Sequence, residues 1–345
     1  MQHNIIFNTV NNVGFIILNR PESKNALNQE MYIELKQYLR EWEKNKKLII
    51  IKSAVENVFS AGGDLKAVKS KTANRAYFSI VYNTIYLIAN YKIPYVAFMS
   101  GITLGGGLGV SIHGQYRVAT DRTVVAMPEA RLGYFPDVGA SYFLPRLPDY
   151  VGTYMGLTGE KIKGNDVVTI GLGTHFVSST RLEELEDALV RTLNKMEVGV
   201  ILNKFNEPAE NSTLAPHFND IKLCFSASTV EGIMERLKSV NNDWSIKTIH
   251  TLQSMCPASL KITLRALQRG AQMELLPCLK MEYRMISRVF DNHDFREGVR
   301  AYITQKHQKP KWHHKSIGDV DEDHVESYFR NLPVNEEFVL TASKI

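Results

Sequence analysis

The sequence has few cysteines and no motif in which they could act together. Cys224, Cys256 and Cys278 are its only three, they lie far apart, and none belongs to a CxxC pair. A disulfide framework or a zinc site is therefore not indicated, and a reducing compartment is expected. No other metal site is predicted.

Long apolar runs and leader-like segments are also missing. No stretch approaches the ~20 apolar residues that a helix needs to cross a bilayer. The opening MQHNIIFNTVNN has neither the basic start and apolar run of a secretion signal nor the Arg- and Ser-rich pattern of a transit peptide. We expect a soluble intracellular protein without membrane contact, cytoplasmic by default, or in the mitochondrial matrix if the chain is a mature eukaryotic form. The final Ser-Lys-Ile resembles a peroxisomal address only weakly.

Charge of one sign is not concentrated in the chain. Lys and Arg number 41 against 36 Asp and Glu, which leaves a net charge of +5. The basic residues are dispersed apart from a run at 306 to 315, so nucleic acid is not expected as a partner. A small anionic ligand suits this charge. With 345 residues, 44% of them hydrophobic, the chain can bury a large core.

The first half alternates apolar strands with helices and glycine turns, which predicts an α/β core over residues 1–196. Asn28 is a plausible cap for the first helix. The apolar spacing predicts strands at 13–20, 47–54, 95–101, 116–120 and 124–127, and helices at 28–44 and 74–91.

Beyond about residue 150 the pattern becomes mainly helical. Residues 197–220 are polar and interrupted by proline, which predicts a linker or an insertion. Residues 221–345 are expected to form a helical region that packs on the core. The expected elements are a helix over 158–172, a brief strand at 175–177, and helices at 180–195, 228–240, 245–255, 257–271 and 274–291.

Two glycine turns each follow an apolar strand. They contain Gly62 and Gly63 in the first case and residues 105–107 in the second. Neither turn matches a dinucleotide-binding or P-loop motif, and each taken singly could be a plain tight turn. Glycine also allows close approach of a ligand to the backbone. Two amide donors from separate turns could form an oxyanion hole if the turns meet.

The stretch MPEARLGYFPDVGASYF places two acids, Glu129 and Asp137, among apolar and glycine residues. Burial would raise the pKa of such an acid, which favours proton transfer near neutral pH. Structural roles compete with this interpretation. Glu129 could cap a helix or form an ion pair, and Asp137 could be a helix N-cap.

Several segments together resemble the crotonase superfamily. The match is carried by NRPESKNALN, FSAGGDLK, SGITLGGGLGVSIHGQYRVAT and MPEARLGYFPDVGASYFLPRL, which occur in the family's order and register. The FPDVGASYFLPRL block and the later CPASLKITLR, EYRM and DFREGVRA resemble the 3-hydroxyisobutyryl-CoA hydrolase branch, and the likeness covers about residues 5 to 330. The resemblance implies an α/β fold, with a spiral ββα core and a mainly helical C-terminal lobe.

The resemblance also implies a reaction and roles for individual residues. The reaction is hydrolysis of 3-hydroxyisobutyryl-CoA to CoA and 3-hydroxyisobutyrate, a step of valine breakdown, with 3-hydroxypropionyl-CoA as a second candidate substrate. No cofactor is implied, since CoA is part of the substrate, and the chain is expected to be a monomer or a small homo-oligomer. The matching positions are Glu129 and Asp137 as catalytic acids, Gly63 and Gly106 as oxyanion donors, Ala61 as the adenine contact, and Asp64, Lys24, Lys66 and Val81 as further substrate or CoA contacts.

Three positions depart from patterns in the family. Gly109 stands where hydratases carry a catalytic acid, so the sequence disfavours hydration. Val81 stands where the hydrolase branch has an acid that contacts the substrate, and Glu22 where hydratases often have a lysine near CoA. Two alternatives therefore stay open. One is an enoyl-CoA isomerase or hydratase activity, and the other is a non-catalytic paralogue acting as an assembly component.

Overall fold

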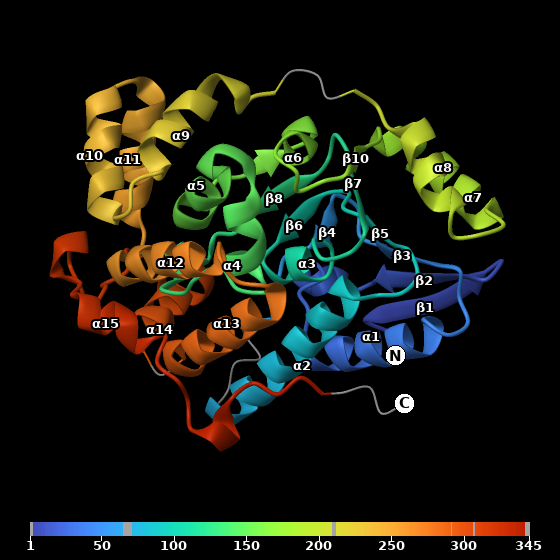
Figure 1. Cartoon of the computed structure of the whole chain (residues 1–345), viewed down its shortest axis with the longest axis horizontal. Helices are drawn as coiled ribbons and strands as arrows, with labels where there is room; N and C mark the ends of the chain where they lie inside the picture. Colours follow the sequence, from blue (N-terminus) through green and yellow to red (C-terminus); the bar gives the residue numbers. More distant parts are fainter. Residues whose placement is uncertain (1–2, 65–70, 209–211, 291, 306–307, 342–345) are drawn as a thin grey trace. The chain divides into compact units, whose positions relative to one another are not determined.

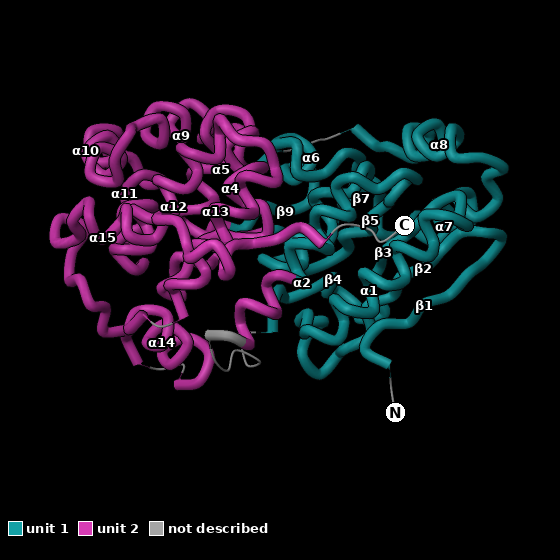
Figure 2. Tube along the Cα trace, turned by 60° about the horizontal axis from the view of Figure 1, so that its bottom comes forward, with its two compact units in different colours: residues 1–67, 80–125, 161–213 teal, residues 68–79, 126–160, 214–345 magenta. Residues whose placement is uncertain are grey.

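The computed structural model describes residues 3–64, 71–208, 212–290, 292–305 and 308–341. The chain forms two compact units (Figure 2). Unit 1 comprises residues 1–67, 80–125 and 161–213, and unit 2 comprises residues 68–79, 126–160 and 214–345. These divisions differ from the expected boundaries at 196 and 221, because the segment with both candidate acids groups with the C-terminal helices.

Unit 1 is built on a six-stranded sheet with the order β1-β2-β3-β5-β7-β10. β1 pairs antiparallel with β2, and the other neighbours pair in parallel. The strands are β1 Ile5–Val10, β2 Val13–Leu18, β3 Leu48–Ser53, β5 Tyr95–Phe98, β7 Tyr116–Ala119 and β10 His175–Phe176.

Helices cover both faces of this sheet, which explains why its central strands are apolar at consecutive positions. α1 (Gln29–Trp42) runs beside β1 and β2 in Figure 1, and the Tyr38 ring stacks on Phe7 with centroids 3.7 Å apart. The expected cap is confirmed, since the Asn28 side chain accepts a hydrogen bond from the Met31 amide. On the other face, α7 (Leu182–Arg191) and α8 (Glu197–Phe205) bury leucines and valine against β2, β3, β5 and β7.

α8 lies inside the segment predicted as a linker, and that part of the prediction is wrong. The segment contributes Val198 and Leu202, which are fully buried in the core of unit 1. The polar, proline-containing stretch that suggested a linker starts only after this helix. The helix predicted over 158–172 forms only in part, as α6 (Asn165–Thr169). Gly159 and Gly164 adopt positive φ values of +64° and +50°, which a right-handed helix cannot continue through.

A second sheet has the order β4-β6-β8-β9. β4 and β6 are parallel neighbours, and each leads into one of the two glycine turns. The strands are β4 Val58–Ser60, β6 Ile102–Leu104, β8 Val124–Ala126 and β9 Ile162–Lys163, and the short helices that follow β6 and β9 are α3 Gly106–Gly109 and α6 Asn165–Thr169.

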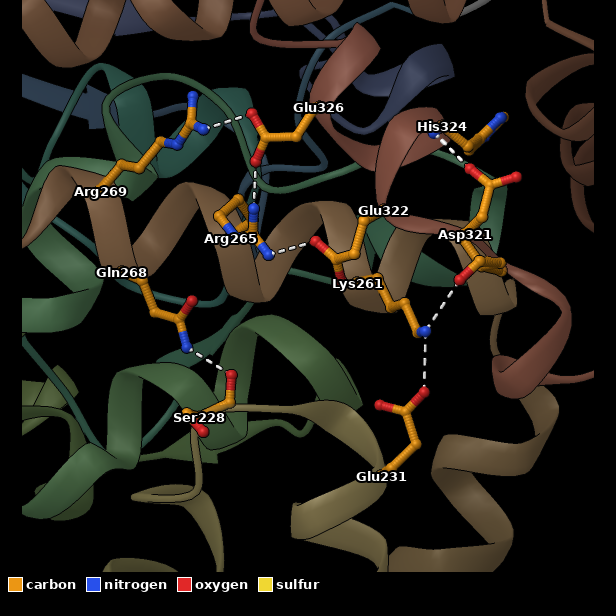
Figure 3. A network of polar contacts seen from close by, with 11 residues as sticks. Ser228, Glu231, Lys261, Arg265, Gln268, Arg269, Asp321, Glu322, His324 and Glu326 are labelled. Carbon is orange, nitrogen blue, oxygen red and sulfur yellow. Dashed lines mark hydrogen bonds and ion pairs between the residues drawn. The ribbon is translucent and has the colours of Figure 1, made fainter.

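Unit 2 is mainly helical and is organised around α12 (Pro257–Gly270). Leu260, Leu264 and Leu267 are at most 5% exposed, as expected for one buried helix face. Figure 3 shows α12 tied to α15 by ion pairs of Arg265 and Arg269 with Glu326. The other helices with residues in unit 2 are α2 Lys71–Ala89, which continues into unit 1 from Ile80, α4 Ala140–Phe143, α5 Val151–Thr158, α9 Phe218–Phe225, α10 Val230–Val240, α11 Asp243–Ser254, α13 Leu275–Val289, α14 His293–Val299 and α15 Glu322–Ser327.

None of the described helices combines the length and apolar character that a bilayer span requires.

Candidate active site

The two glycine turns lie side by side in unit 1. Since β4 and β6 are parallel, their carboxyl ends lie at the same edge of the sheet, and both turns start there. A Cβ atom added to Gly106 would lie 3.0 Å from the Gly63 nitrogen and 3.2 Å from the Gly62 carbonyl carbon. The turns are therefore in close contact, which the sequence alone could not show.

The backbone of the first turn directs the Gly63 amide away from its strand neighbour. Leu27 donates to the Gly62 carbonyl oxygen (2.8 Å) and accepts from the Asp64 amide (3.0 Å), so both groups that flank Gly63 are engaged. The Gly63 N–H points to the opposite side. Gly106 opens α3, where an amide has no acceptor within the helix. Among the described residues neither amide donates a hydrogen bond, which suits a pair of oxyanion donors.

A buried asparagine joins the predicted CoA contacts Lys24 and Ala61. Asn25 is fully buried, donates to the Phe59 carbonyl oxygen (3.0 Å), and accepts from the Ser60 hydroxyl (2.8 Å) through its own carbonyl. Next to it, the Ala61 amide donates to the Lys24 carbonyl oxygen at 2.9 Å. Lys24 is exposed, and its backbone lies next to Ala61. Lys66 lies outside the described residues.

Two other predicted contacts, Asp64 and Val81, are engaged within the protein itself. The Asp64 carboxylate lies 2.7 Å from the Arg20 guanidinium, which also donates to the Ala26 carbonyl oxygen. Asp64 thus fastens the loop that carries Lys24. Val81 is 1% exposed in the unit 1 part of α2, beside the buried Tyr82. An acid at position 81 would therefore have to be buried in this structure.

Both acids lie in unit 2, on a segment with several tight turns. Glu129 begins a short 3-10 helix, Glu129–Leu132, and accepts the Tyr134 amide at its carbonyl oxygen (3.2 Å). Gly133 follows with φ +66°, and a Cβ there would lie 2.3 Å from the Asp294 carbonyl oxygen. The chain then reaches Asp137. Glu129 and Asp137 are 9% and 6% exposed, so both carboxyl groups are buried.

Burial and the charge of Asp137 control the ionisation of Glu129. Burial raises the pKa of Glu129 well above its usual range, and the negative charge of Asp137 raises it further. The Glu129 Oε2 atom is buried and has no hydrogen-bond partner among the described residues. Burial, followed by the negative charges of Asp137 and Glu129, raises the pKa of the Tyr134 hydroxyl. Both causes, burial and the Asp137 charge, favour the protonated form of Glu129.

The competing structural roles are not observed. Within the described residues Glu129 forms no ion pair, and the N-cap residue before it is Pro128. Asp137 is not the N-cap of α4, because that position belongs to Gly139, which has no side-chain cap. In the described ranges, no three His, Cys, Asp or Glu side chains are arranged to hold a metal ion.

A third buried acid, Glu282 of α13, was missed from the sequence. It is fully buried and accepts hydrogen bonds from the Gly139 amide (2.8 Å), the Ser141 amide (2.9 Å) and the Ser141 hydroxyl (2.6 Å). Burial raises the pKa of Glu282 to about 8, although the Ser141 hydroxyl opposes this change. The EYRM motif, which begins at this residue, was the only signal in the sequence.

These raised pKa values predict that the protein becomes less stable as the pH increases. Between the usual glutamate pKa of 4.5 and about 8, folded Glu282 keeps a proton that the unfolded chain releases. The free energy of unfolding therefore falls with pH, by at most about 1.4 kcal/mol per pH unit for each such group. Thermal unfolding between pH 5 and 8 should show a falling Tm, with a shallower slope for Glu282→Gln. Equal slopes in the two proteins would contradict this assignment.

Comparison with known proteins agrees with the fold. A family model described as enoyl-CoA hydratase/isomerase matches residues 13–329. A solved carnitinyl-CoA dehydratase from Mycobacterium thermoresistibile is 30% identical, with a TM-score of 0.92 over 98% of this chain and 99% of that chain. An enoyl-CoA hydratase from Rhodobacter sphaeroides is 28% identical, with a TM-score of 0.89 over 98% and 100%. The predicted crotonase-type α/β fold is confirmed.

Curated relatives have higher sequence identity. The mitochondrial 3-hydroxyisobutyryl-CoA hydrolase of Xenopus laevis is 43% identical over 333 residues, which are 92% of this chain and 86% of that protein. The human protein of the same name is 39% identical over 333 residues, with the same coverage of both chains. The match of the family model over most of its length shows that the chain belongs to the enoyl-CoA hydratase/isomerase family.

Proposed function

We propose that this chain hydrolyses the thioester bond of 3-hydroxyisobutyryl-CoA and releases CoA and 3-hydroxyisobutyrate. The observation that carries the proposal is the buried acid pair, Glu129 and Asp137, in a chain whose hydrolase relatives are similar over nearly its whole length. Thioester hydrolysis requires stabilisation of a developing oxyanion, activation of an oxygen nucleophile, and recognition of the acyl group.

The glycine turns supply the first requirement. The Gly63 and Gly106 amides are neighbouring donors, and we assign both to the thioester oxygen. Negative charge develops on this oxygen when the carbonyl carbon is attacked. Fixed backbone donors stabilise that charge without reorganisation, and one such donor typically contributes roughly 10²–10³ in rate.

The acid pair supplies the other two requirements. We assign to Glu129 the reaction at the thioester carbon, either as the base that takes a proton from water or as the nucleophile itself. We assign to Asp137 the binding of the 3-hydroxyl group and the orientation of the water. Because the pKa of Glu129 is raised, its ionised form becomes available only as the pH rises. Activity should increase with pH over that range.

The remaining assignments concern the CoA part of the substrate, the location of the protein and its pathway. The Ala61 carbonyl is assigned to the adenine. Lys24, which is exposed and bonded to Ala61 through its backbone, is assigned to a phosphate of CoA. The reaction needs no cofactor, because CoA enters as part of the substrate. The relatives' names favour mitochondria among the expected locations, and valine breakdown is the pathway that this substrate implies.

A second crotonase-type activity is the main competitor. The solved hydratase and dehydratase with TM-scores of 0.89 and 0.92 favour it. Gly109, buried at the end of α3, argues against hydration because it offers no side chain where hydratases carry an acid. The assembly-component alternative depends on Val81, and the retained acid pair argues against it.

A small panel of thioesters tests these alternatives. The purified chain should release free thiol from 3-hydroxyisobutyryl-CoA, more slowly from 3-hydroxypropionyl-CoA, and least from isobutyryl-CoA, which lacks the hydroxyl. Methacrylyl-CoA should keep its enoyl absorbance, because hydration is not expected. Loss of that absorbance without thiol release would favour a hydratase. A wild-type protein inert toward all four compounds would contradict any enzymatic role on these substrates.

A further inference from the structure

The turn that follows Asp137 has an unusual backbone. Val138 has φ +57° and Gly139 has φ +85°, so two consecutive residues adopt left-handed conformations. This region is ordinary for glycine but is an outlier for a β-branched residue such as valine. A strained conformation of this kind persists only where the surrounding structure fixes it.

Glu282 provides that restraint from α13. Its Oε2 atom accepts the Gly139 amide, and its Oε1 atom accepts both the amide and the hydroxyl of Ser141. Three donors from one five-residue stretch, 137–141, thus meet a single carboxylate that is 0% exposed. The amides of Gly139 and Ser141 belong to the start of α4, where backbone donors lack partners within the helix.

Burying a carboxyl group between two helices costs desolvation free energy. An apolar pair of similar volume often stabilises a protein as well or better, so the presence of a buried acid at position 282 calls for another explanation. The sequence offers one. Asp at position 137 is a favoured N-cap type for the helix that follows, and capping would engage its carboxylate. Glu282 takes the Gly139 and Ser141 amides instead, and the Ala140 amide donates to the backbone carbonyl oxygen of Asp137.

We propose that Glu282 is a positioning residue for Asp137. It fastens residues 139–141, maintains the left-handed turn at Val138, and so fixes the direction in which Asp137 presents its carboxylate to the substrate hydroxyl. The inference rests on the proposed function and deepens it. It assigns the first residue of the EYRM motif, which the sequence analysis used only as a mark of family resemblance, to recognition of the 3-hydroxyl group.

The expected consequence is a change in selectivity rather than a uniform loss of activity. In Glu282→Gln, the amide NH₂ group cannot accept a hydrogen bond, so at least one of the three donors loses its acceptor. The turn can then relax and Asp137 moves. Because isobutyryl-CoA has no hydroxyl for Asp137 to bind, its hydrolysis should be affected less than that of 3-hydroxyisobutyryl-CoA.

The experiment measures kcat and KM for both thioesters in four proteins: wild type, Glu282→Gln, Ser141→Ala and Asp166→Asn. The ratio of the two kcat/KM values should fall about tenfold in Glu282→Gln and by a smaller factor in Ser141→Ala, as expected for loss of one or two hydrogen bonds. Asp166 is a matched control. It is a 4% exposed acid of unit 1 that accepts the Thr213 amide (3.1 Å) and hydroxyl (2.6 Å). Its variant should keep the wild-type ratio.

The possible outcomes separate this inference from the proposed function. A purely structural role would lower the folded fraction and reduce both activities equally, and an unchanged ratio in Glu282→Gln would overturn the positioning role. If Glu282→Gln does not fold, the ratio in Ser141→Ala decides the question, because that variant removes a single donor. A wild-type protein without thiol release would overturn the hydrolase function, and the positioning role with it.

Discussion

Glu129→Gln is expected to lower kcat on 3-hydroxyisobutyryl-CoA by roughly 10²–10⁴, the range usual for loss of a general base. The amide has nearly the same size and shape but cannot accept a proton from water or attack the thioester carbon. The rise of kcat/KM with pH, which wild-type Glu129 should produce well above pH 4.5 because its pKa is raised, should disappear in this variant. Steady-state assays across a pH series measure both effects.

Stability should change in the opposite direction. The wild-type carboxyl has a buried, unpartnered Oε2 atom, and its charged form is disfavoured by burial and by Asp137. Removing that charge should raise the Tm at pH 8, where unfolded Glu129 would be ionised. Glu274→Gln is a suitable control, because Glu274 is an exposed residue at the start of α13. It should leave kcat unchanged. Wild-type kcat in Glu129→Gln would exclude this residue from the reaction.

A single turnover in ¹⁸O-labelled water distinguishes the two roles left open for Glu129. If Glu129 activates water, the label enters the hydroxy acid in the first turnover. If Glu129 is the nucleophile, its carboxyl group forms an anhydride with the acyl group and CoA leaves as the thiol. Attack of water at the glutamyl carbon then leaves the label in the protein. Mass analysis of the peptide with Glu129 measures this difference.

Local features of the fold could be predicted because they depend on neighbours in the chain. The apolar runs at β2 and β3 and the spacing of Leu260, Leu264 and Leu267 are direct consequences of strand and helix periodicity. The Asn28 cap could be identified for the same reason, since its partner is the amide three residues later. The resemblance to a known family supplied the candidate acids, which periodicity does not reveal.

Contacts between distant segments could not be predicted in this way. Glu282 meets Ser141 across 141 residues of sequence, and nothing near either residue indicates the pairing. The approach of Gly106 to Gly63 depends on the parallel pairing of two three-residue strands, β4 and β6, which are too short to give a clear pattern. α8 was misread for a related reason. Its buried residues are few, and their partners lie in strands far earlier in the chain.

Val81 stands where the hydrolase branch has an acid, and the structure shows what surrounds this position. Val81 is part of a buried apolar face of α2 with Phe78, Tyr82 and Ile85. Unit 2 meanwhile holds Glu282 as a further buried acid beside the segment that carries Glu129 and Asp137. The departure at position 81 therefore concerns unit 1, while unit 2 retains both acids that the resemblance implies, and Glu282 binds the segment that follows Asp137.

Gly106→Ala is expected to lower kcat by roughly 10²–10³, the effect of losing an oxyanion donor, with a smaller effect on KM. The added Cβ would lie 3.0 Å from the Gly63 nitrogen and 3.2 Å from the Gly62 carbonyl carbon, both of them backbone atoms that cannot rotate away. The two turns must move apart, and the spacing of the two amides changes. The backbone at Gly106 has an ordinary negative φ, so this effect is one of contact and not of backbone strain.

Gly171→Ala serves as the control, because it strains the backbone without creating a close contact. Gly171 is also in unit 1, has φ +85°, and has no atom within 4 Å of an added Cβ. Alanine there strains the backbone and should lower the Tm while leaving kcat at the wild-type level. Gly106→Ala should lower kcat far more than its change in Tm explains. If Gly106→Ala also retained full kcat, the thioester oxygen would have to be stabilised by groups other than these two amides. The reason is that the added methyl group changes the distance between the two donors.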